Sequence, residues 1–170
     1  MQHHALPERL PQAQPQRSRI NIAQLVGAGD KIGLVLLPCL IVGVSANAVE
    51  RSAFAVGGPA EALRIASTFL LSVGVALWAW SAFLIVTRVP QHELITNGPF
   101  ALVKHPLYTS VALFVLPWLG FLLNTWLGAA LGIVLYLASR RYAVEEEADL
   151  AHTFGAAWAQ YRQNVRISWL

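Results

Sequence analysis

The sequence has too few charged residues to cover a water-soluble domain. Only 12% of its 170 residues are Asp, Glu, Lys or Arg, and 56% are hydrophobic, whereas an ordinary soluble domain carries about 25% charged residues. The mean hydropathy is +0.52. Because such a chain cannot shield a core from water behind a polar surface, we predict a single membrane domain with short polar flanks.

Cysteine and the common signature motifs are also scarce. The chain has one cysteine, Cys39, so no disulfide can form within it. It has no phosphate-binding glycine loop, no Gly-x-Gly-x-x-Gly after a strand, no His-Glu-x-x-His and no Gly-x-Ser-x-Gly. No His, Cys and carboxylate residues have the spacing of metal ligands, so we expect no metal. The net charge of +3 is scattered beside apolar segments, which indicates a lipid bilayer rather than nucleic acid as partner.

Long apolar segments are what the sequence has in abundance. We predict a first span over about residues 32–49 and a second over 65–86, a stretch without one charged residue. At 1.5 Å per residue the second is about 33 Å long, enough to cross a bilayer core of about 30 Å. Two further apolar stretches, 107–123 and 126–138, are together too long for one span. We therefore predict that they form a tight helical hairpin.

These segments predict an all-α integral membrane protein with about four transmembrane helices, including the C-terminal hairpin. The second arm of the hairpin is expected to continue past Arg140 into the acidic run of residues 145–147. Beyond it, apolar residues recur at spacings of four, four and three, which is typical of an amphipathic helix at the membrane interface. This stripe consists of Leu150, Phe154, Trp158 and Tyr161.

The basic residues predict the orientation of this multi-pass protein. Of the 12 Lys and Arg residues, ten lie in the N-terminal flank, in the loop after the second span or in the C-terminal segment. The other two, Arg51 and Arg64, lie between the first two spans. The positive-inside rule then places both termini and the loop of residues 87–104 in the cytoplasm.

The first segment that indicates chemistry runs from Asn97 to Tyr108. Pro106 suits the first turn of a helix, because its missing N–H would have no partner there, and His105 is then held extended before the helix. Such a helix start presents free N–H groups to a carboxylate or to the ring nitrogens of a ligand. The alternative is that Lys104 and His105 only anchor a helix at the lipid headgroups.

The second such segment is the acidic run. One turn before the apolar stripe, Glu146 and Glu147 lie on the same helix face as its aromatic residues. Carboxylates that approach an apolar face cost free energy unless they have partners. Arg141 lies one turn before Glu145 and could pair with it. The alternative is a solvated acidic patch where the helix leaves the membrane.

Taken together, the two segments resemble the isoprenylcysteine carboxyl methyltransferase family and its relatives, the membrane phospholipid N-methyltransferases. The family pattern consists of Gly-Pro-Tyr, Arg-His-Pro-x-Tyr, a helical hairpin, Glu-Glu-x-x-Leu, Phe-Gly and two spaced aromatic residues. The likeness covers about residues 94–165. Lys104 stands in place of the usual Arg, Phe100 in place of Tyr, and Ser110 where Gly is common. Because Glu145, Glu146 and Glu147 are consecutive, the Glu-Glu pair of the pattern could begin at Glu145 or at Glu146.

The resemblance implies S-adenosylmethionine as cofactor and a lipid-soluble or amphipathic methyl acceptor that enters from the bilayer. Arg141 and Glu146 are the implied catalytic residues, with Arg141 steering an anionic acceptor group. Residues 31–170 would form one methyltransferase-like domain, with two spans in 31–88 and the cofactor-binding core in 89–170, after a polar, partly disordered segment of residues 1–30. The implied cofactor-binding residues are Lys104, His105, Pro106, Tyr108, Glu146 and Glu147.

Several functions remain open at this point. The acceptor is expected to be a carboxylate, but the amine of a phospholipid or a small thiol is an alternative. A membrane reductase of the sterol-reductase type, which binds NADPH, shares a similar C-terminal core. A non-catalytic subunit or transporter would need ionisable groups in mid-membrane, and the first two predicted spans contain none.

Overall fold

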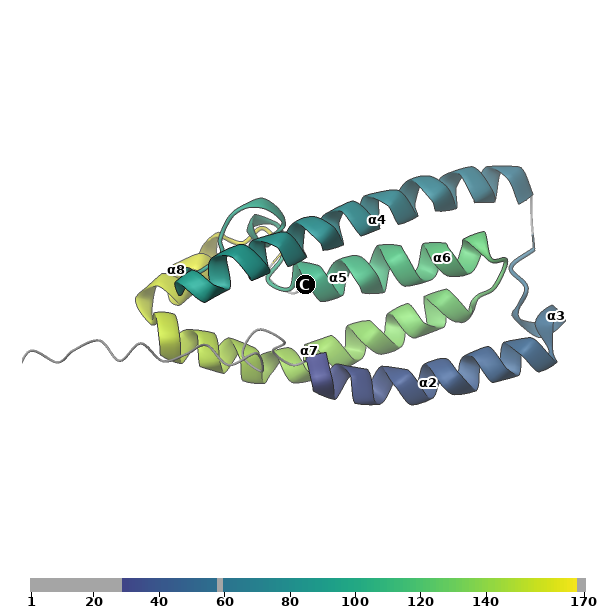
Figure 1. The fold of residues 1–170 in the computed structure, drawn as a ribbon, viewed down its shortest axis with the longest axis horizontal. Coiled ribbons are helices and arrows are strands. Elements are labelled where there is room, and N and C mark those ends of the chain that lie inside the picture. The colour runs from purple at the N-terminus through teal and green to yellow at the C-terminus, as the bar shows by residue number, and fades with distance from the viewer. Residues whose placement is uncertain (1–28, 58–59, 168–170) are drawn as a thin grey trace, which may run out of the picture.

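The computed structural model describes residues 29–57 and 60–167, which are mostly helical. Three long helices and a shorter helical rod lie side by side along the long axis of the molecule (Figure 1). Apart from Gly29 and Asp30, which begin the first of the described helices, the predicted polar segment of residues 1–30 lies outside the described residues. The helices are α2 (Gly29–Val49), α3 (Arg51–Phe54), α4 (Ala60–Arg88), α5 (Pro106–Ser110), α6 (Leu116–Leu122), α7 (Leu127–Phe154) and α8 (Ala156–Asn164).

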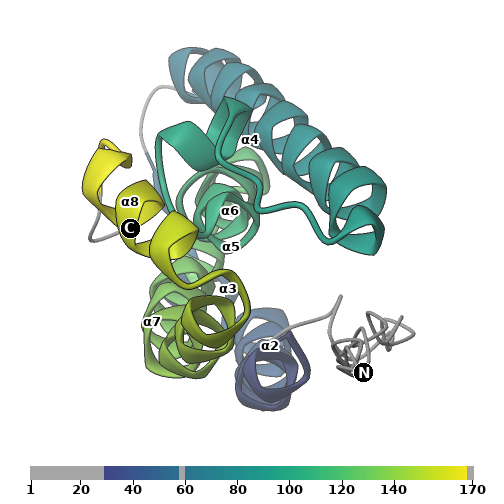
Figure 2. The same cartoon turned by 90° about the vertical axis from the view of Figure 1, so that its left-hand side faces the viewer.

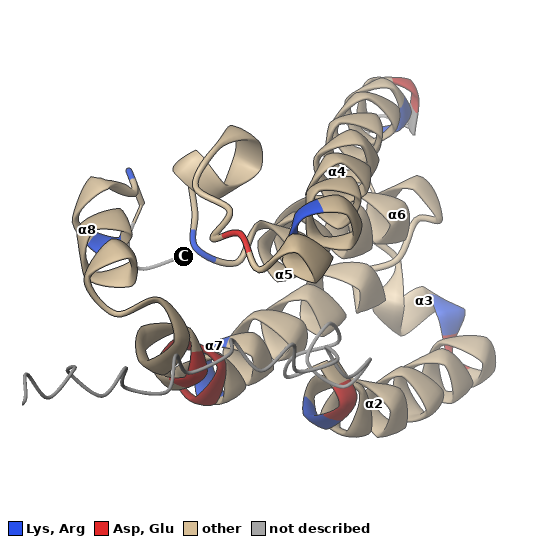
Figure 3. Cartoon of the chain, turned by 60° about the vertical axis from the view of Figure 1, so that its left-hand side comes forward, with Lys and Arg blue, Asp and Glu red and all other residues tan. Residues whose placement is uncertain are grey.

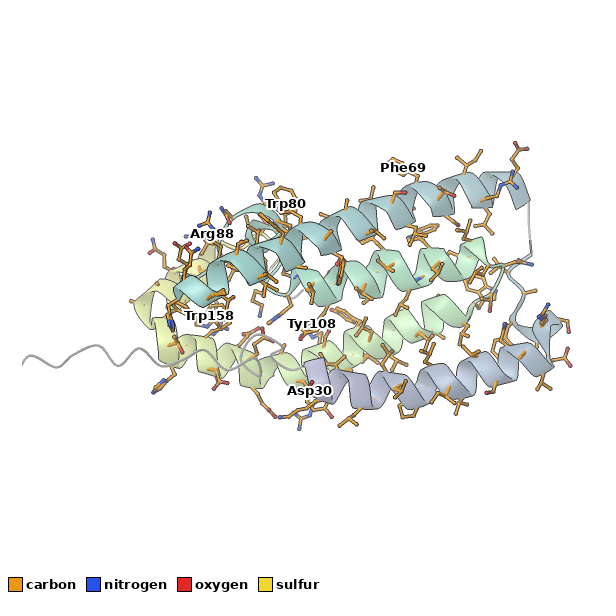
Figure 4. The ribbon with its side chains drawn as sticks, in the orientation of Figure 1. Asp30, Phe69, Trp80, Arg88, Tyr108 and Trp158 are labelled. Atoms are coloured by element: carbon orange, nitrogen blue, oxygen red, sulfur yellow. The ribbon has the colours of Figure 1, made fainter. Side chains whose placement is uncertain are left out.

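Three helices in the described part of the chain are long and apolar enough to cross a membrane: α2, α7 and the helix that contains α4. The fourth rod, Pro106–Leu122, is shorter, at about 26 Å. Phe69 on α4 points away from the bundle (Figure 4) and is 66% exposed, as suits a side chain that contacts lipid. Charged residues gather toward the two ends of the rods (Figure 3). The predicted all-α integral membrane fold is confirmed.

The helices extend further than the apolar segments. The second predicted span, residues 65–86, is the middle of α4, which continues through Glu61 and Arg64 on one side and to Arg88 on the other. Glu and Arg are good helix formers, so the end of an apolar run does not end a helix. The bounds of a span in the membrane and of its helix therefore differ.

The predicted hairpin is present, and its first arm changes helical register in the middle. A π-helical segment, Val111–Val115 (η3), joins α5 to α6 just before Pro117. A proline inside an α-helix removes a hydrogen bond and clashes with the carbonyl of the preceding turn. A π-helical turn is one of the recognised ways in which a helix accommodates such a disruption.

The two arms approach each other closely because glycines line the crossing. A Cβ atom on Gly128 would lie 2.1 Å from the carbonyl oxygen of Leu116 and 2.7 Å from the Cα atom of Gly120. Thr125 closes the turn, and its backbone N–H donates to the Gly120 carbonyl at 2.8 Å. The Thr125 hydroxyl also donates to the side-chain carbonyl of Asn47 at 2.9 Å, which ties the hairpin tip to the end of α2.

The core lies where α2, α7 and the hairpin meet. Ile32 from α2, Ala112 from η3, and Leu135 and Ala138 from α7 are buried together. In the end view of Figure 2, the α5–α6 rod lies between α4 and α7, and α2 lies beside α7. The remainder of α2 is mostly exposed. This arrangement gathers the predicted functional segments at one end of the bundle.

The predicted interfacial helix begins later than the apolar stripe indicated. Gly155 adopts φ 50°, a conformation that disfavours residues with a Cβ, and it ends α7 after Phe154. The stripe is therefore shared between α7 and α8. Its members still gather, because buried Trp158 and Tyr161 of α8 pack against Leu150 and Phe154 of α7. The Phe-Gly pair was the sequence signal for this break.

Candidate active site

The loop between α4 and α5 carries the first predicted segment. It begins with a 3₁₀ turn, Val89–Gln91 (η1), and includes a second, Gly98–Ala101 (η2). Gly98 has φ 60° and lies under the side chains of Trp80 and Leu84, where a Cβ atom would be 3.1 Å from the Trp80 ring. Only glycine combines this conformation with such a close approach. The loop is thereby folded back over α4 toward the start of α5.

The helix start at Pro106 has the predicted form. Pro106 is the first residue of α5 and is buried, while His105 precedes it with φ −123°. The His105 side chain makes no capping hydrogen bond to its own helix. Its imidazole is therefore available to groups on other elements.

Two acids from α7 lie against this helix start. The Lys104 ammonium is 2.5 Å from Glu147 Oε1, and His105 Nε2 is 3.3 Å from the same oxygen. His105 Nδ1 is 4.0 Å from Glu146 Oε1. The Lys104 and His105 side chains are only 14% and 11% exposed. We call these four residues, Lys104, His105, Glu146 and Glu147, the charged cluster.

The charged cluster has an excess of negative charge. With the imidazole counted as neutral, one ammonium faces two carboxylates. Charges in a partly buried place interact more strongly than at the surface, because water screens them less. The cluster is therefore suited to a ligand that brings a positive charge. Within the described residues, no three His, Cys, Asp or Glu side chains are grouped so that they could hold a metal ion.

The third acid of the run points elsewhere. Glu145 forms an exposed ion pair with Lys31, near the start of α2. Successive residues of a helix point about 100° apart, so Glu145 cannot face the same neighbours as both Glu146 and Glu147. Of the three acids, it is therefore Glu146 and Glu147 that lie against the start of α5. Lys31 and Glu145 are 114 residues apart, and no sequence signal links them.

Tyr108 and Arg141 differ in their relation to the charged cluster. The Tyr108 ring lies 6.4 Å from the His105 ring, centroid to centroid. Figure 4 shows Tyr108 between α5 and α7, where it packs on the buried core. Arg141 is exposed and lies 5.9 Å from the ring of its neighbour Tyr142. Among the described residues, the ion pairs of the charged cluster do not include Arg141. The predicted pair of Arg141 with Glu145 is also not among the ion pairs there, because Glu145 pairs with Lys31.

Tyr161 contacts the loop between α4 and α5, which the sequence did not predict. Its hydroxyl donates to the Phe100 carbonyl at 2.8 Å. Burial, together with the negative charge of Glu147, raises the pKa of Tyr161 to about 12. The phenol therefore stays protonated at neutral pH and can act as a donor. The sequence marked Tyr161 as part of an apolar stripe but gave no sign of its partner.

A comparison with known families identifies the kind of protein. The family model described as isoprenylcysteine carboxyl methyltransferase (ICMT) matches residues 61–152, from the start of α4 to the end of α7. The match includes all four residues of the charged cluster and stops before α8. Neither a curated protein nor a solved structure matches the chain. Since the match covers more than half of its length, the chain belongs to the isoprenylcysteine carboxyl methyltransferase family and is a membrane methyltransferase of that type.

Proposed function

We propose that this protein transfers a methyl group from S-adenosylmethionine to a lipid-soluble acceptor that carries a carboxylate. One observation carries the proposal: Glu147, with Glu146 beside it, lies against Lys104 and His105 at the start of α5. A sulfonium cofactor is a cation, and the excess negative charge of the charged cluster complements it. The family match supports the reaction type.

The cofactor would supply an electrophilic methyl group, and the residues would bind and orient it. We assign Glu146 and Glu147 to its ribose hydroxyls or its amine, because carboxylates accept hydrogen bonds from both. His105, Pro106 and Tyr108 would line the adenosine end, and Lys104 would hold Glu147 in place. Methyl transfer is an in-line displacement, which needs mainly positioning and electrostatic complementarity.

A carboxylate is the favoured acceptor because it is already ionised at neutral pH and needs no base. An amine or a thiol would first lose a proton, which would require a group such as His105 or Glu146 nearby. Arg141 is our choice for steering an anionic acceptor, since it lies on α7 little more than one helical turn before the acids. Its exposed position leaves it able to meet an acceptor that arrives from outside the bundle.

We also infer that the charged cluster, both termini and α8 are on the cytoplasmic side, with α3 and the hairpin tip opposite. Of the nine Lys and Arg residues that the structure describes, seven lie on the side of the cluster, and the exceptions are Arg51 and Arg64. Residues 31–170 would act as one domain, in which residues 31–88 provide two spans and residues 89–170 provide the core that binds the cofactor.

The test is transfer of labelled methyl from S-adenosylmethionine into a total lipid and metabolite extract. We expect the Glu147→Gln and Glu146→Gln variants to lose at least tenfold in rate, because each removes one negative charge from the site, about 1.4 kcal/mol or more. Glu145→Gln is the matched control: it is the same change on the same helix, at a residue that pairs with Lys31, and it should keep the parental rate. Parental rates in both cluster variants would rule out our site.

Thermal stability shows which of two cofactor types the protein binds. S-adenosylhomocysteine should raise the melting temperature of the purified protein in detergent, and NADPH should not, because only a ligand that binds the folded state stabilises it. Stabilisation by NADPH alone would favour a reductase. The labelled product identifies the acceptor: base-labile label indicates an ester, whereas label in phospholipid amines indicates N-methylation.

A further inference from the structure

The loop of residues 89–105 positions half of the charged cluster with little regular structure of its own. Apart from its two short 3₁₀ turns, it forms no helix, and Lys104 and His105 lie at its end. Side chains on loops are held less firmly than those on helices. The geometry of the cluster therefore depends on what holds the loop.

Helix α8 and the residues that follow it make hydrogen bonds to three consecutive carbonyls of this loop. The Tyr161 hydroxyl donates to the Phe100 carbonyl at 2.8 Å. The backbone N–H groups of residues 166 and 167 donate to the carbonyls of residues 101 and 102 at 3.3 and 2.9 Å. Val103 and Ile167 form a parallel bridge, directly before Lys104. We call residues 165–167 the C-terminal strap.

The strap is anchored to the same helix that carries the acids. Trp158, Tyr161 and Val165 are buried together. Leu94 from the loop and Leu150 from α7 pack against them. Figure 2 shows α8 beside both the loop and the end of α7. One buried cluster thus connects the element that carries Lys104 and His105 to the element that carries Glu146 and Glu147.

We propose that Tyr161 and the C-terminal strap are positioning elements that hold Lys104 and His105 against the acids of α7, so that the cofactor site is formed before the cofactor binds. This inference rests on the proposed function for its catalytic consequence. Tyr161 and Ile167 act through the loop. Without the strap, binding would have to order the loop, and that free-energy cost would weaken the affinity for the cofactor.

The first test compares two changes at one position. Ile167→Pro removes the N–H that donates to the Leu102 carbonyl, whereas Ile167→Ala trims the side chain and keeps the N–H. Tyr161→Phe removes the hydroxyl that bonds the Phe100 carbonyl, and Tyr142→Phe is the same deletion away from the strap. The full-length protein in detergent is used throughout.

Two readouts separate positioning from stability. For Ile167→Pro and Tyr161→Phe we expect the KM for S-adenosylmethionine and the Kd for S-adenosylhomocysteine to rise about fivefold, the effect of one net hydrogen bond. The kcat and the melting temperature should stay near the parental values. Hydrogen exchange of amides in residues 98–105 should accelerate about tenfold while α4 is unchanged. The two control variants should behave as the parent.

Each outcome either supports the inference or overturns it. Loss of kcat with an unchanged KM, faster exchange throughout the bundle, or no difference between Ile167→Pro and Ile167→Ala would overturn it. If the parent fails to bind S-adenosylhomocysteine, the proposed function is wrong, but exchange at residues 98–105 still decides whether the strap orders the loop. The two failures are therefore distinguishable.

Discussion

At the scale of the residue, Lys104 is more deeply buried than Lys31 and Arg88, which also form ion pairs. Its side chain is 14% exposed and that of Glu147 is 20% exposed, whereas Arg88 and Glu93, which pair at 2.6 Å, are each 46% exposed. Removing one partner of a partly buried pair leaves the other without compensation for its lost hydration. An exposed partner is rehydrated instead.

This difference predicts unequal coupling in two double-mutant cycles. Combining Lys104→Met with Glu147→Gln should give a coupling free energy of about 1–3 kcal/mol in reversible unfolding from detergent micelles. The matched cycle with Arg88→Met and Glu93→Gln should give less than about 1 kcal/mol. Equal coupling in the two pairs would mean that burial does not strengthen the pair of Lys104 and Glu147.

The sequence nominated the residues of the charged cluster but left their contacts undecided. His105 and Pro106 could be placed at a helix start because proline favours the first turn of a helix, a preference that depends only on the local sequence. The separation of Glu145 from Glu146 and Glu147 could not be predicted, because it depends on the rotation of α7 and on where Lys31 of a distant helix lies. The roles assigned to these residues stay predictions.

At the scale of the element, the crossing of α6 and α7 brings the two arms of the hairpin together beside their turn. The backbones approach so closely at Gly120 and Gly128 that no Cβ atom fits. Small residues permit such close packing between membrane helices.

Gly128→Ala should therefore destabilise the protein by about 1–3 kcal/mol, the usual effect of overpacking, since the atoms that a methyl group would meet belong to the backbone. Gly33→Ala on α2 is the control, because no atom lies within 4 Å of the Cβ position there. It should be neutral or slightly stabilising, as alanine is the better helix former. Unfolding midpoints in detergent compare them, and equal midpoints would contradict the packing argument.

The elements themselves were largely predictable, and their interruptions were only partly so. The hairpin follows from the length of two apolar runs around Asn124 and Thr125. The break at Gly155 had a local signal that the regular aromatic spacing concealed. The π-helical turn before Pro117 could not be located from the sequence, because its position depends on how η3 packs against Gly132 of α7, where the Ala112 carbonyl would be 2.3 Å from a Cβ atom.

At the scale of the whole molecule, the distribution of Lys and Arg residues predicts how the protein is oriented in the membrane. In a Cys39→Ala background, single cysteines at the exposed positions Gln91, His152 and Ser52 report the two ends of the bundle. An impermeant maleimide on intact cells should label the Ser52→Cys variant. It should label the Gln91→Cys and His152→Cys variants only after permeabilisation. The reverse pattern would show that the proposed topology is inverted.

The length of α7 has a consequence for how two dissimilar reactants meet. Glu147 follows Leu127 by about 20 residues, which is about 30 Å of helix and equals the thickness of the hydrocarbon layer. With Leu127 at one boundary of the hydrocarbon layer, the charged cluster would lie at the other boundary, next to the aqueous phase. Under the proposed function, the polar cofactor would reach the cluster by diffusion from the aqueous phase, and the lipid-soluble acceptor would reach it by diffusion in the bilayer plane. Neither reactant has to leave the phase in which it dissolves.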